Sequence, residues 1–207
     1  MKTSSFSLTL TFLVLLAFAS ADPNPVLDID GKKLRAETHY YILPVVRGMG
    51  GGLSLDFTGR VNNSEVSFCP LDVVQERLEV ENGLPVTFSP VNPKKDVIRE
   101  STDHNIQFEA MTICIQSTLW QLASQDEATG LYFVATGGQK GNPGKDTLRN
   151  WFKIEKFDNY YKLVFCPSVC DICKVICMDV GIYVDENHMR RLVLSEKPFL
   201  VMFKKVD

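Results

Sequence analysis

Along most of the chain, apolar and polar residues alternate in short runs rather than at helical spacing. The runs are rich in β-branched and aromatic residues, and clusters of Gly, Asn, Asp and Pro separate them, as is typical of strands joined by turns. Short strands at this density predict an all-β barrel or sandwich. The expected strands are residues 40–46, 52–57, 73–74, 85–88, 106–108, 112–114, 120–122, 132–136, 151–156, 161–166, 182–184, 191–193 and 200–203.

The N-terminus departs from this pattern. Lys2 precedes an apolar run at residues 8–20, and the small residues Ala19 and Ala21 fit a signal-peptidase site. The run is short for a membrane span, which needs about 20 apolar residues. We therefore predict a signal peptide at residues 1–21 and one secreted domain at residues 22–207, which is long enough to bury a core.

Charge and short motifs narrow the function classes. The formal charge is −3 with both signs intermixed, so no basic stripe suggests a nucleic-acid partner, and no second apolar run suggests a membrane. The motif Asn62-Asn63-Ser64 predicts N-glycosylation of Asn62 in a secreted chain. The histidines lie in no nucleophile or metal motif, so we expect no enzyme, metal or cofactor; they are His39, His104 and His188.

Six cysteines pose the main chemical question. Four of them follow the spacing C-x3-C-x2-C-x3-C near the C-terminus, which suits a metal site, a redox motif or disulfides. Secretion favours disulfides, and the symmetry of the spacing favours nested bridges, although sequence alone allows 15 pairings. The favoured pairs are Cys166–Cys177, Cys170–Cys173 and Cys69–Cys114.

The stretch VLDIDGKKLRAETHYYI, residues 26–42, resembles the N-terminal signature of the plant Kunitz (soybean trypsin inhibitor) family. The resemblance continues through RGMGGGLSL, CPLDVVQE, STDHNIQF, NWFKIEKF and RRLVLSEKPF, and the cysteine pattern with GNPG is most similar to the miraculin-like branch. It implies a β-trefoil, in which twelve strands form a six-stranded barrel capped by three hairpins with pseudo-three-fold symmetry. It also implies the same three disulfides. The matching signature positions are Val26, Asp28, Asp30, Gly31, Leu34 and Tyr40.

For function, the resemblance implies a secreted, monomeric plant-defence protein whose partners are secreted proteases, serine proteases first. Members block the protease by presenting one rigid, extended loop that mimics a substrate. The corresponding loop here is SPVNPKKDVIR, residues 89–99. Its expected contact residues are Pro90, Val91, Asn92, Pro93, Lys94, Lys95 and Asp96.

Two positions depart from the family pattern. Trypsin-inhibiting members carry Arg or Lys two residues after the Ser-Pro pair, and a gap-free alignment places Asn92 at that position. Lys94 or Lys95 would therefore have to fill the acidic pocket of a trypsin-like protease. The alternative is that both lysines are solvated loop charges. Strong inhibitors also brace the loop with an Asn at the position of Ala36, where a neighbouring Arg35 or Glu37 could substitute.

Other features of the branch predict what this chain lacks and what else it could do. The taste-modifying histidines of the branch align with Met49 and Asn82, and no cysteine is left over, so we expect neither taste activity nor a covalent dimer. The alternative function is a secreted protein that has lost serine-protease inhibition and acts on cysteine proteases or as a binding or storage protein. The expected destination is the apoplast, with the vacuole as the alternative.

Overall fold

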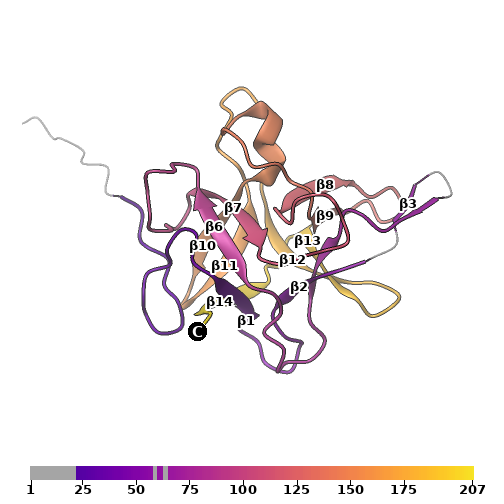
Figure 1. Ribbon diagram of the computed structural model, residues 1–207, viewed down its shortest axis with the longest axis horizontal. Helices are drawn as coiled ribbons and strands as arrows, with labels where there is room; N and C mark the ends of the chain where they lie inside the picture. Colours follow the sequence, from indigo (N-terminus) through magenta and orange to yellow (C-terminus); the bar gives the residue numbers. More distant parts are fainter. Residues whose placement is uncertain (1–21, 58–59, 63–64) are drawn as a thin grey trace, which may run out of the picture.

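The computed structural model describes residues 22–57, 60–62 and 65–207 (Figure 1). The predicted signal peptide lies outside the described residues, as do Asn63 and Ser64 of the glycosylation motif; Asn62 itself ends the short strand β3. Within the described part, the one helix is a 3-10 helix, η1 (Lys145–Asn150), and no helix is long and apolar enough to cross a membrane.

Six strands pair in a closed ring. β1 pairs with β6 and β14, β6 with β7, β7 with β10, β10 with β11, and β11 with β14, all antiparallel. A closed ring leaves no free sheet edge, so every strand of this barrel has two hydrogen-bonded neighbours. The strands are β1 (Tyr40–Pro44), β6 (Val86–Pro90), β7 (Asp103–Phe108), β10 (Phe152–Phe157), β11 (Tyr160–Phe165) and β14 (Leu200–Lys205).

Six further strands form three hairpins, β2–β5, β8–β9 and β12–β13. Their second strands also pair with one another, because β5, β9 and β13 meet in a three-way junction. The bounds are β2 (Leu53–Asp56), β5 (Asp72–Gln75), β8 (Gln121–Gln125), β9 (Tyr132–Ala135), β12 (Met178–Val184) and β13 (Arg190–Ser195). A two-stranded extension, β3 (Arg60–Asn62) and β4 (Glu65–Ser67), lies between β2 and β5 in the chain.

Barrel and hairpins together repeat one four-strand unit three times. The units are β1-β2-β5-β6, β7-β8-β9-β10 and β11-β12-β13-β14, each a hairpin between two barrel strands. This arrangement confirms the β-trefoil with twelve main strands that the family resemblance implies.

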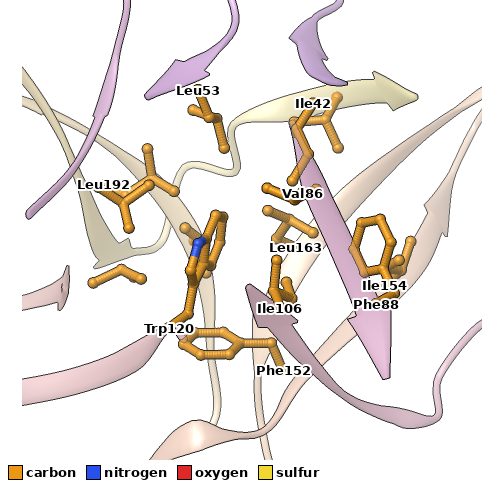
Figure 2. Packing of buried hydrophobic residues seen from close by; sticks show 14 of the residues in the cluster. Ile42, Leu53, Val86, Phe88, Ile106, Trp120, Phe152, Ile154, Leu163 and Leu192 are labelled. Atoms are coloured by element: carbon orange, nitrogen blue, oxygen red, sulfur yellow. The ribbon is translucent and has the colours of Figure 1, made fainter. Parts of the chain in front are cut away.

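The core fills the barrel and the space under the hairpins. Trp120 is fully buried, and its ring packs 5.6 Å from Phe108 and 5.8 Å from Phe152 between ring centres. Figure 2 shows side chains from all three units, such as Leu53 and Leu192, converging on this tryptophan. One face of each strand points into this shared core, which explains why apolar and polar residues alternate along the strands.

Two details of the predicted secondary structure are wrong. Residues 112–114 form no strand; they lie in the connection between β7 and β8, and Cys114 is buried there while Ile113 is exposed. The prediction also omitted β3, β4 and η1, which are short and lack an apolar face long enough to give a period.

Candidate functional site

The predicted contact loop, residues 89–99, begins at the end of β6 and continues into residues 91–102, which join barrel strands β6 and β7. At its base, the backbone N–H of Val91 donates to the carbonyl of Asp103 over 2.9 Å, which continues the pairing of the two strands. Every residue from Asn92 to Asp96 is exposed. The loop therefore projects from the rigid barrel, at the left of Figure 1 beside the N-terminal segment.

The loop tip is a hydrogen-bonded turn. The carbonyl of Asn92 accepts the backbone N–H of Lys95 over 3.0 Å, and its side-chain Oδ1 accepts that of Lys94, also over 3.0 Å. Pro93 occupies the second turn position, for which its fixed φ is suited. The tip is thus compact, unlike the fully extended loop that the resemblance implies, and Asn92 shapes the turn.

Beyond the turn the chain is extended and lies against the N-terminal segment. The backbone N–H of Ala36 donates to the carbonyl of Asp96 over 2.7 Å, and that of Ile98 donates to Leu34 over 3.0 Å. Val26 donates in turn to Ile98 over 3.0 Å. Because Ile98 is fully buried, this limb is anchored by the core as well as by backbone hydrogen bonds.

Both neighbours of Ala36 brace the loop through their side chains. The guanidinium of Arg35 forms an ion pair with the carboxylate of Asp96. The carboxylate of Glu37 accepts the Ser89 hydroxyl over 2.8 Å at the opposite stem, and Lys140 lies 3.5 Å from the same oxygen. The methyl group of Ala36 contributes no hydrogen bond, so Arg35 and Glu37 take up the side-chain bracing.

The two lysines of the tip are exposed, and one has an acidic neighbour. Lys95 Nζ lies 3.7 Å from Asp22, whose carboxylate is also 3.6 Å from Arg99. Arg99 in addition donates to the carbonyl of Pro23 over 2.6 Å. The start of the described chain is therefore held against the base of the loop by charge.

A buried histidine supports the end of the loop. His104 Nε2 and Thr102 Oγ1 are 3.1 Å apart, and the Thr102 hydroxyl donates to the carbonyl of Arg99 over 2.8 Å. Burial lowers the pKa of His104 to about 4, so the imidazole is neutral at neutral pH. No sequence pattern indicates this role, because it depends on the contact with Thr102.

The three disulfides are the favoured pairs, and all six cysteines are bonded. One of them, Cys166–Cys177, encloses a residue that contacts the start of β7, next to the predicted loop. Ser168, inside the Cys166–Cys177 loop, donates its hydroxyl to the buried carboxylate of Asp103 over 2.5 Å. Among the described residues, no group of three or more His, Cys, Asp or Glu side chains is placed to hold a metal ion.

Comparison with known proteins places this geometry in context. Residues 26–205 match the family model described as trypsin and protease inhibitor, of Kunitz legume type. Miraculin from Synsepalum dulcificum is 55% identical over 92% of this chain and 87% of its own length. Kunitz trypsin inhibitor 5 from Arabidopsis thaliana is 47% identical, covering 96% of this chain and 98% of its own.

Solved structures agree. Soybean trypsin inhibitor is 32% identical with a TM-score of 0.70, covering 88% of this chain and all of its own. A Kunitz-type cysteine protease inhibitor from potato is 35% identical with a TM-score of 0.73, covering 90% of this chain and 99% of its own. Sequence and fold relatives thus include proteins named for two classes of protease.

Proposed function

Because this chain belongs to the Kunitz family of trypsin and protease inhibitors, we propose that residues 89–99 inhibit a trypsin-like serine protease, with Lys95 in its specificity pocket. The observation that carries the proposal is the position of Lys95. It ends the exposed Asn92 turn and immediately precedes Asp96, which is held through both its carbonyl and its carboxylate. An exposed cation beside a fixed peptide bond suits an acidic pocket.

Lys95 is favoured over Lys94 by backbone shape. A protease cleft binds its substrate as an extended strand, through main-chain hydrogen bonds. The N–H groups of both lysines are bonded to Asn92, but Lys94 lies inside the turn, whereas Lys95 is its last residue. Lys95 opens the extended limb, so it can present its side chain without unfolding the turn.

The bracing explains how such a loop would inhibit rather than be consumed. After attack on the Lys95 carbonyl, the leaving amine is that of Asp96. Arg35 and the N–H of Ala36 hold Asp96 in place, so the amine stays beside the acyl group and religation competes with hydrolysis. A loop ordered before binding also loses less conformational entropy when it binds.

Single-residue variants test the assignment. Trypsin is titrated with the wild-type protein, Lys95→Ala and Lys94→Ala. Lys94→Ala is the control, because it removes the same charge one residue away. We expect a one-to-one end point for wild type, a loss of inhibition of roughly 100-fold or more for Lys95→Ala, and little change for Lys94→Ala. The reverse ranking would reject Lys95, and full inhibition by the double variant Lys94→Ala/Lys95→Ala would reject the loop.

The same proteins are titrated against papain. The resemblance to the potato cysteine protease inhibitor makes that activity the second candidate. Papain inhibition that survives in the double variant, together with inactivity toward trypsin in wild type, would replace the serine-protease proposal.

We further propose that the chain is secreted to the apoplast as a monomeric defence protein, cleaved after Ala21 and glycosylated on Asn62. Three disulfides support an oxidising compartment. Mass spectrometry of protein collected from plant cell medium should show Asp22 as the first residue and a mass loss on deglycosylation. An intact N-terminus, or retention in the vacuole, would contradict the proposal.

A further inference from the structure

A second exposed loop, residues 109–117, joins β7 to β8 and has no role in the function proposed above. Met111, Ile113 and Ile115 are each at least 77% exposed, and two of them are exposed completely. Aliphatic side chains normally lie in the core, and several gathered on one protrusion mark a contact surface.

This loop is held in shape. At its base, the N–H of Phe108 donates to the Thr118 carbonyl over 3.3 Å, and the Thr118 hydroxyl donates back to Phe108 over 2.6 Å. Near its tip, Cys114 is disulfide-bonded to Cys69, with 5.7 Å between Cα atoms. The Thr112 hydroxyl donates to the Cys114 carbonyl over 3.2 Å. The aliphatic side chains are therefore presented by an anchored backbone.

We propose that residues 109–117 form a second protease-binding loop, in which Met111 enters an apolar specificity pocket and Met111–Thr112 is the bond presented. Met111 is the unbranched member of the three, so it can extend into a narrow slot that a β-branched Ile cannot follow. It is flanked by Ala110 and Thr112, which are small. A serine protease of the chymotrypsin or subtilisin class has such a pocket.

The disulfide gives this bond the property an inhibitor needs. The protease serine would attack the Met111 carbonyl, and the proton it loses would pass to the departing amine of Thr112. Thr112 lies two residues before Cys114, so the disulfide keeps that amine close and lets it reform the bond while the serine is released. If water attacks instead, the products are a Met111 carboxylate and a Thr112 ammonium group.

The first loop and the Met111–Thr112 bond both lie inside the ring closed by Cys69 and Cys114, so a cut at either place releases no fragment. They also leave opposite ends of one hairpin. Pro90 pairs with His104 at the end carrying residues 91–102, and Val86 pairs with Phe108 at the end carrying residues 109–117. Figure 1 shows the two ends on opposite sides of the β6–β7 pair. One molecule can thus offer the loops to two proteases at once.

A nearly fully exposed side chain on a short, disulfide-anchored loop suits insertion into a pocket better than self-association through a flat surface, which is why a protease is the assigned partner rather than a second copy of the chain. Phe68 adds an apolar contact beside it, since its carbonyl lies 3.7 Å from Cys114 Sγ and its ring is 58% exposed. Such a rim would shield the bound pocket from water.

The test uses chymotrypsin and subtilisin with the full oxidised protein. In the Lys94→Ala/Lys95→Ala background, which removes the first loop's charges, we expect inhibition of at least one of the two enzymes. Adding Met111→Asp should weaken that inhibition roughly 100-fold, because a carboxylate enters an apolar pocket. Ile172→Asp is the matched control, since Ile172 is 92% exposed in the separate Cys166–Cys177 loop.

Met111→Lys in the wild-type background provides a gain of function that does not depend on which apolar protease is chosen. We expect the trypsin end point to rise from one to two per inhibitor. Failure of the first loop would remove the first trypsin and leave the second, so the two proposals fail separately. An end point unchanged by Met111→Lys, absence of inhibition of both apolar-pocket enzymes, or self-association abolished by Met111→Asp would overturn the second loop.

Discussion

The loops at the two ends of the β6–β7 hairpin are stabilised by different means. Residues 91–102 are polar and are held by the N-terminal segment through the Ala36–Asp96 hydrogen bond and the Arg35–Asp96 ion pair. Residues 109–117 carry exposed aliphatic side chains and are held by the Cys69–Cys114 disulfide. One loop depends on charge and burial, and the other on a covalent bond, so different perturbations should separate them.

In the first loop, the neighbours of Ala36 make the side-chain contacts that an Asn at position 36 was expected to make. Ala36 supplies a backbone N–H only, while Arg35 and Glu37 reach Asp96 and Ser89 from either side. An ion pair exposed on both sides is a weak brace, since such pairs contribute about 0–1 kcal/mol. The buried Ile98 beneath the limb is the stronger anchor.

The largest effect should come from removing the covalent anchor. The double variant Cys69→Ser/Cys114→Ser opens a loop of 45 residues, and we expect the free energy of unfolding to fall by about 4 kcal/mol in the entropic model. The second loop should lose inhibition while trypsin binding by the first is retained at low temperature. Urea unfolding and titration of both protease classes measure this.

Cys170→Ser/Cys173→Ser is the matched control, because its sequence separation is only 3 and the expected loss is roughly 2 kcal/mol. Equal loss of both inhibitory activities on opening Cys69–Cys114 would show that the two loops share one anchor.

A smaller effect is the loss of stability at low pH caused by His104, which lies where the first loop meets β7. Burial holds the pKa of His104 at about 4 in the folded protein, below its usual value of 6.5. The unfolded chain therefore binds a proton that the folded chain does not between these values. Stability should fall by about 3 kcal/mol as the pH drops from neutral to 4, and level off with respect to this group once the pH is well below the folded pKa.

His104→Gln keeps a polar side chain and removes the titration. Urea unfolding of wild type and variant at pH 7, 5.5 and 4 should give a shallower pH dependence for the variant. Identical slopes in the two proteins would exclude His104 as the source of acid sensitivity.

The smallest effect tests the exposed brace. Arg35→Ala removes the partner of Asp96 and should raise the trypsin inhibition constant up to about fivefold, without changing chymotrypsin or subtilisin inhibition. Lys32→Ala is the control, since Lys32 is also an exposed cation, its side chain being 73% exposed, and its ion pair is with Asp30 at 3.8 Å. A similar change in both variants would point to net charge rather than bracing.

Much of the fold could be predicted from the sequence because the trefoil buries one face of nearly every strand. Alternation located β1, β2, β10 and β14 to within two residues. The closed ring and three-way junction could not come from periodicity, which is local, and entered through the family resemblance. Residues 112–114 misled the prediction, because the β-branched pair Thr112 and Ile113 is typical of strands, yet here it lies in a loop with Ile113 exposed.

The site was predictable in part. The loop and its lysines could be located from the resemblance, and the Asn-Pro pair of residues 92–93 is a turn signal in its own right. The contacts of Arg35 with Asp96 and of His104 with Thr102 depend on how separate strands are placed, so no sequence pattern indicates them. The exposure of Met111 is likewise a property of the fold.

The most direct test of two independent inhibitory loops is a mass measurement of the complex. Wild-type protein is saturated with trypsin, an equal amount of chymotrypsin or subtilisin is added, and size-exclusion chromatography with light scattering gives the molar mass. Two loops at opposite ends of one hairpin predict a complex of one inhibitor with two different proteases. Displacement of trypsin, or a mass that stays at one protease per inhibitor, would contradict the account.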